Sequence, residues 1–298
     1  MRVDAPTVKV LVVIPHYFDP HGSGRHGSTG PDAGRRIAAL SRSLLGLRET
    51  LGPHQAFLYC LHENVPGRGN GRLLRVNDSS ASRLDIVICT AGHNHLVGQL
   101  LVPPHFFRHQ PVQTDPMLVG FACRGVLKAH LGQYDYYCYM EDDLLLTDSF
   151  FLLKLAWFNA TFGDAAVLLP HRFETSEKEP LQKLYIDGPV REDFTAKWQD
   201  INDRRHLRAE VLGQEMCFER WPNPHSGCFF LNARQMEKWA ASEDFAAIDC
   251  SFAGPLESAV SLGIMKNFRI YKPSCANAGF FEVRHLDNRY LGAALRTS

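Results

Sequence analysis

Apolar positions along the chain alternate between short continuous runs and longer stretches with helical spacing. The run at residues 8–15, VKVLVVIP, is β-branched and uninterrupted, which is typical of a strand buried on both faces. In residues 32–52 the apolar side chains follow helical spacing, which predicts an amphipathic helix with Asp32 as its cap. Related patterns predict strands at 55–63, 84–92, 134–140 and 165–173, helices at 116–132 and 148–162, a strand followed by a helix within 225–242, and a helix followed by a strand within 255–273.

Strands and helices that alternate in this way favour an α/β fold, with a mostly parallel sheet and helices on both of its faces. Polar segments interrupt the pattern. Residues 64–82 are predicted to be a connection, 181–196 a hairpin, and the residues up to about 213 form a charged segment without a clear assignment. No internal repeat and no clear boundary is visible, so residues 1–298 are predicted to form a single domain with an elaborated C-terminal half.

Three consecutive carboxylates follow the aromatic strand predicted at 134–140. Glu141, Asp142 and Asp143 repel one another, so a folded chain tolerates them only where they are solvated or shared with cations. Strand alternation would place Glu141 and Asp143 on one side and Asp142 on the other. Open α/β sheets bind ligands beyond the carboxyl ends of their strands, and Mg²⁺ and Mn²⁺ prefer oxygen ligands. The triplet therefore predicts a cation site, and a charged surface turn is the plain alternative.

The stretch YMEDDLLLTDSFF, residues 139–151, resembles the metal-binding strand of the GT-A glycosyltransferases. Its Glu-Asp-Asp form with a later DSFF is most similar to the N-acetylglucosaminyltransferase type. The resemblance implies a GT-A, Rossmann-like sheet flanked by helices. It also implies that residues 1–147 bind a nucleotide sugar and that residues 148–298 form the acceptor-side half.

The same resemblance implies roles within the triplet. Asp143 would bind Mn²⁺ or Mg²⁺ on the donor diphosphate, Asp142 would contact the ribose or the donor sugar, and Glu141 would lie nearby. The segment IPHYF at the end of the first strand is similar to the proline-containing segment that lines the nucleotide pocket of many GT-A enzymes. Its candidate residues are Pro15, His16 and Tyr17.

Two further stretches supply candidates for donor binding. His225, Ser226 and Gly227 resemble the small-residue turn that shapes the donor-sugar and acceptor side, and glycine permits a close backbone approach. Arg124 shares a helix face with Lys128 and is a candidate for the donor phosphates. A turn formed for conformation alone and a solvated helix face are the respective alternatives.

The acceptor side carries a candidate catalytic base. Pro255 and Glu257 open a predicted helix in an ordinary way, because proline and an acid both suit the first turn. The segment also resembles the late helix of inverting GT-A enzymes, which implies that Glu257 takes the proton of the acceptor hydroxyl, with Asp249 as the second candidate. His285 is similar to the histidine that completes the metal shell in many of these enzymes, although a lone histidine is more often structural.

A glycine pattern after the first strand suggests a different chemistry. Gly22, Gly24 and Gly27 satisfy the dinucleotide-binding fingerprint, which requires its glycines at the turn between a strand and a helix. Pro15 and Pro20 intervene here, and the helix begins only near Asp32. The stretch also lacks the lysine of a P-loop, so a loop over the nucleotide is the better interpretation.

These features predict a metal-dependent glycosyltransferase of the hexosyl- or N-acetylhexosaminyltransferase type. It would transfer a sugar from a nucleotide-diphosphate sugar, with uridine diphosphate as the commonest carrier in this class, to a hydroxyl of a saccharide or another acceptor. Two alternatives remain. A sugar nucleotidyltransferase would normally carry a Gly-rich basic signature after its first strand, and a non-catalytic protein of the same fold would only bind nucleotide sugars or carbohydrate.

Composition narrows the choice of partners. Thirty-two basic and 32 acidic residues give a formal net charge of zero, so neither nucleic acid nor an anionic membrane is expected as the main partner. No apolar stretch of about 18 residues predicts a transmembrane helix, and the N-terminus is not typical of a signal peptide. Eight cysteines without a CxxC pair are predicted to be reduced thiols of a cytoplasmic protein. The oligomeric state is left open.

Overall fold

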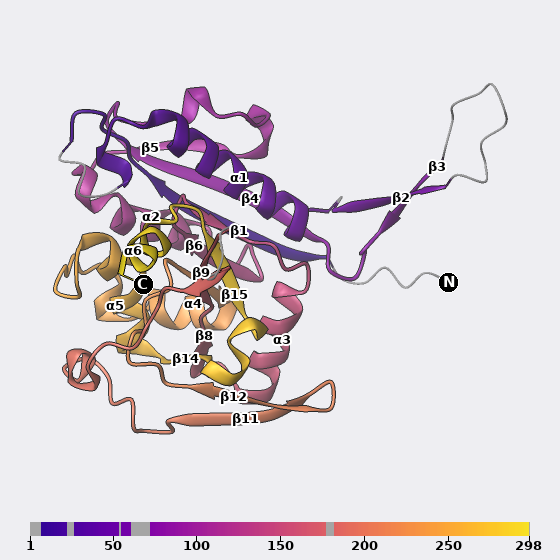
Figure 1. Ribbon diagram of the computed structural model, residues 1–298, viewed down its shortest axis with the longest axis vertical. Helices are drawn as coiled ribbons and strands as arrows, with labels where there is room; N and C mark the ends of the chain where they lie inside the picture. The colour runs from indigo at the N-terminus through magenta and orange to yellow at the C-terminus, as the bar shows by residue number, and fades with distance from the viewer. Residues whose placement is uncertain (1–6, 23–26, 54, 61–71, 177–181, 298) are drawn as a thin grey trace.

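The structure is a computed structural model that describes residues 7–22, 27–53, 55–60, 72–176 and 182–297. It is a mixed α/β protein whose largest sheet has five strands (Figure 1). The strands of this sheet follow the order β13 (Cys228–Asn232), β6 (Tyr136–Met140), β1 (Val8–His16), β4 (Ser82–Ala91) and β5 (Arg108–Val112). β1 is parallel to β4 and to β6, and β4 is parallel to β5, whereas β13 is antiparallel to β6.

Helices cover both faces of the five-stranded sheet. They are α1 (Ala33–Leu51), α2 (Val119–Ala129), α3 (Phe151–Phe162), α4 (Ala233–Ala240) and α5 (Pro255–Asn267). A further helix, α6 (Arg289–Thr297), contacts the strand at His171–Thr175, which belongs to a different sheet. α1 and α3 contribute to one hydrophobic core, and α2, α4 and α5 contribute to the other. Asp32 caps α1 as predicted, since its carboxylate accepts a hydrogen bond from the amide of Arg35. No helix in the described ranges has the length and apolar character needed to cross a membrane.

β1 forms the middle of the sheet, and its side chains alternate between the two cores. Val10, Val12 and Ile14 pack on the side of α1, whereas Leu11 and Val13 pack on the side of α2. All five side chains are fully buried. The uninterrupted apolar run therefore reflects burial on both faces of a strand, which confirms its prediction.

Two four-stranded sheets extend the C-terminal half. One has the order β10 (Lys183–Tyr185), β9 (His171–Thr175), β15 (Glu282–His285) and β7 (Leu144–Leu145). The other has the order β11 (His206–Val211), β12 (Gln214–Glu219), β14 (Arg269–Pro273) and β8 (Ala166–Leu168). β2 (Ala56–Cys60) and β3 (Arg72–Val76) form an antiparallel ribbon that projects from the body (Figure 1).

The sheets are mixed, which corrects the prediction of a mostly parallel sheet. Parallel pairs prevail in the five-stranded sheet, but each four-stranded sheet contains only one parallel pair, β15 with β9 or β14 with β8. Neighbouring strands of the C-terminal half are often joined without a helix, which favours antiparallel pairing. β11 and β12, for example, are joined by a turn at Leu212 and Gly213, and both residues have positive φ.

Several predicted elements differ from the observed ones. The connection predicted at 64–82 contains β3 and the first residue of β4, and its residues before Arg72 lie outside the described part, as does Gly24 of the glycine pattern. The strand predicted at 165–173 is in fact two strands, because the chain leaves β8 and joins a different sheet as β9. The hairpin predicted at 181–196 supplies only β10 and a 3₁₀ helix, and the hairpin of this region is β11–β12.

The packing of α5 against α4 leaves no room for a side chain at Gly263. A β-carbon at Gly263 would lie 2.6 Å from Cζ2 of Trp239, a fully buried indole. Gly263→Ala is therefore expected to lower the free energy of unfolding by about 1–3 kcal/mol, as measured by urea denaturation. Gly125→Ala in α2 is the matched control, because a β-carbon there meets nothing within 4 Å. Equal stabilities of the two variants would contradict this account of the α4–α5 contact.

Candidate functional site

The acidic triplet lies at the carboxyl-terminal edge of the five-stranded sheet. β1 ends at His16 and the parallel neighbour β6 ends at Met140, so the residues that follow both strands meet at one edge. β13 runs in the opposite direction and brings Gly227 beside Glu141, whose amide donates to the Gly227 carbonyl at 2.9 Å. Open α/β sheets bind their ligands at this edge.

His16 joins the end of β1 to the triplet. Its Nδ1 lies 2.6 Å from Oδ2 of Asp142, and its Nε2 accepts a hydrogen bond of 3.0 Å from the amide of Leu96. Because Nε2 is an acceptor, the proton of the neutral ring is on Nδ1 and is donated to the carboxylate. The buried imidazole therefore holds Asp142 in one orientation.

Arg36 of α1 is the counter-ion of both aspartates. Its Nη2 donates to Oδ1 of Asp142, and its Nη1 donates to Oδ2 of Asp143 at 3.1 Å. Burial would raise the pKa of Asp142, but Arg36 and His16 outweigh this effect and lower the pKa to about 2. Burial lowers the pKa of Arg36, whereas the two carboxylates raise it above its usual value. Asp142 and Arg36 are therefore both charged.

Asp143 has one oxygen that lacks a hydrogen-bond partner within the described chain. This oxygen, Oδ1, is buried, whereas Oδ2 faces Arg36 and lies 3.7 Å from Nε2 of His285. The backbone fixes the arrangement, because the Asp143 carbonyl accepts from the amide of Leu286 at 2.9 Å and Leu144 pairs with His285. A buried carboxylate oxygen without a donor is unfavourable unless a ligand, a water or a cation completes it.

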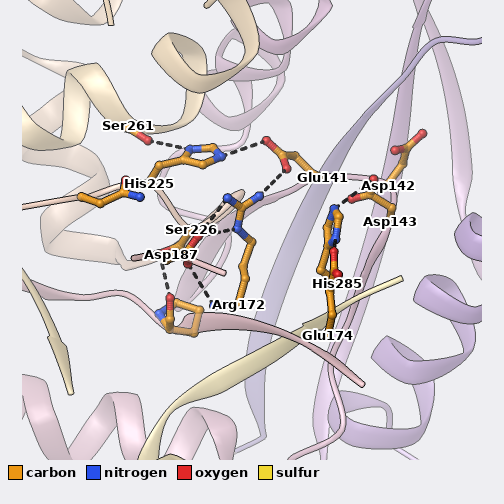
Figure 2. A network of polar contacts seen from close by, with 12 residues as sticks. Glu141, Asp142, Asp143, Arg172, Glu174, Asp187, His225, Ser226, Ser261 and His285 are labelled. Atoms are coloured by element: carbon orange, nitrogen blue, oxygen red, sulfur yellow. Dashed lines mark hydrogen bonds and ion pairs between the residues drawn. The ribbon is translucent and has the colours of Figure 1, made fainter. Parts of the chain in front are cut away.

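Glu174 of β9 orients His285. Its Oε1 lies 2.8 Å from Nδ1 of His285, and its Oε2 accepts from the amide of Leu291 at 2.6 Å, in the first turn of α6. Burial would raise the pKa of Glu174, but these hydrogen bonds lower it. With Nδ1 held by Glu174, the ring directs Nε2 toward Asp143 (Figure 2). A carboxylate on the distal nitrogen is the usual way in which a metal-binding histidine is oriented.

Asp143 and His285 are the residues of this edge that would hold a divalent cation. They offer the unpartnered Oδ1 and the Nε2 atom, but no cluster of three or more His, Cys, Asp or Glu side chains suited to a metal occurs in the described ranges. Mn²⁺ or Mg²⁺ would therefore take its other ligands from water and phosphate oxygens. Burial lowers the pKa of His285, but the hydrogen bond to Glu174 and the charge of Asp143 outweigh this effect and raise the pKa above its ordinary value.

Glu141 has a separate environment. Its carboxylate lies 3.6 Å from Nη1 of Arg172 and 3.7 Å from Nε2 of His225. A β-carbon at Gly227 would lie 2.6 Å from Oε2 of Glu141, and the φ of Gly227 is +64°, so this position requires glycine. Burial raises the pKa of Glu141 to about 8, although Arg172 acts against the rise. The carboxyl group is therefore able to hold a proton at neutral pH.

A buried chain of ion pairs holds Arg172 in place. Asp187 accepts from Nε of Arg172 at 2.9 Å and from its backbone amide at 3.0 Å (Figure 2). Nζ of Lys272 lies 3.0 Å from the same carboxylate and also donates to the carbonyl of His225. Burial, reinforced by the charge of Arg172, holds the pKa of His225 well below its ordinary value. His225 is therefore neutral beside Glu141.

The three carboxylates of the triplet are grouped differently from the prediction. Strand alternation placed Glu141 with Asp143, but the structure pairs Asp142 with Asp143 on a common guanidinium and turns Glu141 toward a different one. The reason is that β6 ends at Met140, so the triplet follows the strand in a turn and strand alternation does not apply to it.

Four other predicted site residues are connected to the triplet less directly than His16 and His285 are. They are Pro15, Tyr17, Ser226 and Glu257. Pro15 is a buried residue of β1, and Tyr17 is partly exposed just beyond that strand. Ser226 uses its hydroxyl to donate to the carbonyl of Pro170 at 2.7 Å. Glu257 lies in the first turn of α5, as predicted, and its charge contributes to the raised pKa of the Glu141 carboxyl, after the larger effect of burial.

Arg124 and Asp249 make structural contacts. Nη2 of Arg124 donates to the carbonyls of Ser258 and Ala259 at 3.1 and 2.8 Å, so this side chain ties α2 to α5. Burial lowers its pKa to about 10. Asp249 lies 3.3 Å from Nζ of Lys266. These contacts give no support to phosphate binding by Arg124 or to proton transfer by Asp249.

The sequence patterns missed the cations and carboxylates that organise the site. Arg36 carried a readable signal, since it lies four positions before Leu40 on the buried face of α1, where a charge needs a partner. Arg172 and Glu174 lie two positions apart on β9 and so share one face of the strand. Asp187 gave no local signal, because its partners lie 15 and 85 positions away.

Removal of the charge of Asp187 is expected to destabilise the fold. Its fully buried carboxylate lies between two buried cations, so Asp187→Asn removes the carboxylate partner of Lys272 and leaves Arg172 with only the more distant Glu141 at 3.6 Å. The free energy of unfolding in urea should fall by about 3–5 kcal/mol. Asp193→Asn is the control, because its ion pair with Arg191 is largely exposed, and no resolvable change is expected. A loss of less than about 1 kcal/mol for Asp187→Asn would contradict the buried-pair account.

The lowered pKa of Asp142 predicts an acid-dependent loss of stability. The folded pKa is about 2, and the unfolded value is about 3.9, so this carboxylate stabilises the fold above about pH 4. Its contribution is lost as the pH falls from about 4 to about 2. In Asp142→Asn the free energy of unfolding should decline less steeply across this window, by up to about 1.4 kcal/mol per pH unit. Identical slopes for the two proteins would show that Arg36 and His16 do not stabilise the ionised form.

No protein-family model and no curated protein matches the chain. Among solved structures, the chain is similar to S. aureus TarS 1-349, with a TM-score of 0.44 and 8% identity over 97% of this chain and 64% of that chain. A second structure of S. aureus TarS gives a TM-score of 0.45 and 9% identity over 93% of this chain and 36% of that chain. The chain thus spans less than two thirds of either TarS chain. A likeness this distant carries no argument about function.

Proposed function

We propose that this protein is a metal-dependent glycosyltransferase of GT-A type that uses a nucleotide-diphosphate sugar, with uridine diphosphate as the carrier. The observation that carries the proposal is the pair of Asp143 and His285. Oδ1 of Asp143 is buried without a hydrogen-bond partner in the described chain, and Oδ2 of the same carboxylate lies 3.7 Å from Nε2 of His285, whose other nitrogen is held by Glu174. The pair lies at the edge of the sheet where ligands bind, and Asp143 belongs to the segment 139–151 that resembles the GT-A metal-binding strand.

Different residues of the chain would bind different parts of the donor. Asp143 and His285 would hold Mn²⁺ or Mg²⁺, which supplies positive charge for the diphosphate leaving group. Asp142 is fixed by His16 and Arg36 and would contact the ribose or the donor sugar. The turn at Gly227 would shape the donor-sugar side through Glu141, because the Gly227 carbonyl accepts from the Glu141 amide and a β-carbon there would meet the Glu141 carboxylate.

Glu257 is the proposed base toward the acceptor hydroxyl. It is partly exposed at the start of α5, and its charge acts on the carboxyl group of Glu141. A base must lie within hydrogen-bond reach of the acceptor hydroxyl. α5 also contacts the site through Ser261, whose Oγ lies 3.2 Å from Nδ1 of His225. Asp249 is not retained as a second base, because Lys266 and the amide of Ser251 already bind its carboxylate.

The acceptor is proposed to be a hydroxyl-bearing molecule such as a saccharide, and the protein is proposed to act in the cytoplasm. All eight cysteines lie in the described chain as free thiols, which suits a reducing compartment.

The rival functions differ in their products. A nucleotidyltransferase releases pyrophosphate from a sugar 1-phosphate and a nucleoside triphosphate, and a binding protein turns over neither substrate.

Loss of Asp143 is expected to abolish catalysis. A panel of nucleotide sugars is first screened by thermal shift with and without Mn²⁺, and the binding donor is then followed for hydrolysis or transfer. Asp143→Ala removes the only carboxylate of the proposed metal pair, so the rate should fall by at least about 100-fold. The melting temperature without ligand reports whether the fold survives.

Asp135→Asn is the matched control for this variant. Asp135 lies at the opposite end of β6, where its carboxylate accepts a hydrogen bond from the amide of Lys9 at 2.7 Å. This control should keep the wild-type rate and metal dependence. The proposed function is wrong if Asp143→Ala turns over donor at the wild-type rate after the divalent metal has been chelated.

A further inference from the structure

A cavity lies at the amino-terminal end of β4 and β5, opposite the sheet edge that carries the acidic triplet. Its volume is about 430 Å³, which is within the range of small-molecule sites. β4 begins at Ser82, but its first pair with β5 is Val87 with Arg108, so the first residues of β4 extend beyond the start of β5. Arg83 and Asp85 of this extension line the cavity.

Positive charge prevails in the cavity lining. Three guanidinium groups line it, from Arg48 of α1, Arg83 of β4 and Arg108 of β5. Asp85 supplies the only carboxylate among the described lining residues. Because arginine stays protonated in proteins, the lining carries an excess of two positive charges even if both of its histidines are neutral.

Asp85 is engaged by neighbours and is not a free negative charge. Its Oδ2 accepts a hydrogen bond of 2.9 Å from the hydroxyl of Tyr134 and lies 3.7 Å from Nε of Arg83. Burial and the hydrogen bond to Asp85 raise the pKa of Tyr134 to about 12, so the hydroxyl keeps its proton and remains a donor. An anion in the cavity would therefore not face an unpaired carboxylate.

Arg108 has only an imidazole as its side-chain partner in the described chain. Its Nη2 lies 3.4 Å from Nε2 of His130, and Nδ1 of the same ring lies 2.8 Å from the carbonyl of Val126. A carbonyl only accepts, so Nδ1 carries the proton, and Nε2 is the acceptor that faces the guanidinium. The charge of Arg108 is therefore positioned but not neutralised.

Arg48 is held by uncharged groups as well. Its Nη1 donates to the carbonyl of Leu84 at 3.0 Å, and its Nη2 donates to the carbonyl of Phe106. Its buried Nε has no hydrogen-bond partner in the described chain. Burial lowers the pKa of Arg48, although the charge of Asp85 acts against this effect. A partly buried cation without a carboxylate partner of its own is stabilised by an anion nearby.

One class of ligand matches this charge and this volume. A phosphate monoester carries two negative charges above its second pKa of about 6, which matches the positive excess of the lining. Arginine side chains bind phosphate oxygens in a fork geometry, and the rings of Phe107 and Tyr134 line the same cavity. From this match we propose that the cavity is a binding site for a small phosphate monoester. The site needs no metal and does not depend on the proposed function.

Isothermal titration calorimetry of the wild-type protein tests the site. Divalent metals are chelated, so that no metal at the acidic edge attracts phosphate. The probes are glucose 6-phosphate, inorganic phosphate and glucose. Glucose 6-phosphate should bind with a Kd below about 1 mM, and glucose should bind at least about tenfold more weakly. Inorganic phosphate should compete with glucose 6-phosphate but bind less tightly, because it lacks the organic part.

Arg108→Gln and Arg83→Gln each remove one guanidinium from the lining. Both side chains are exposed, so both variants are expected to fold, and the melting temperature checks this. Each should weaken the binding of glucose 6-phosphate by at least about tenfold, because a charge-assisted hydrogen bond is lost. Arg42→Gln is the matched control, since Arg42 is exposed on α1 outside the cavity lining, and it should bind as the wild type does.

A loss of affinity in either folded variant, with the control unchanged, supports the site. Three results overturn the inference: no binding of glucose 6-phosphate by the wild type, equal or tighter binding of glucose or inorganic phosphate, or wild-type affinity in both arginine variants. None of these results bears on the proposed function, which depends on Asp143 and a divalent metal at the other edge of the sheet.

Discussion

Mutual repulsion of three consecutive carboxylates is the constraint around which this edge of the protein is arranged. Glu141, Asp142 and Asp143 leave the sheet in a turn, where no strand geometry separates them. The surrounding elements reduce this repulsion in two ways. Arg36 from α1 stabilises the two aspartates as ions, whereas burial keeps the pKa of Glu141 high enough for it to hold a proton. The triplet therefore contains two different kinds of carboxyl group.

β9 links these two environments. Arg172 and Glu174 lie on the same face of the strand, and each contacts a different part of the site. Arg172 extends toward Glu141 and is held by Asp187, and Glu174 binds the imidazole of His285. A single strand thus positions both the neutral and the ionised side of the triplet, so a displacement of β9 would alter both.

Buried ion pairs of this kind contribute more to orientation than to net stability, because desolvation offsets much of their attraction. Lys272 and Asp187 are both fully buried, and their hydrogen bonds connect β14 to the turn that precedes β13. The same turn contains His225 and the positive-φ Gly227. The network therefore fixes the backbone against which Glu141 packs. Each charged member needs a partner because its burial removes it from water.

The sequence by itself determined those features that depend only on interactions between residues close together in the chain. The β-branched run of β1, the Asp32 cap of α1 and the position of the triplet after an aromatic strand follow from residue type and spacing alone, because each depends on neighbours within one turn or one strand. Only the tertiary structure decided the rest. The mixed sheets of the C-terminal half, the divergence of Glu141 from Asp143, and the partners of Arg36 all depend on which strands lie side by side. Arg36 is separated from its partners by 106 and 107 positions, and no periodicity along the chain records an attraction between charges that distant.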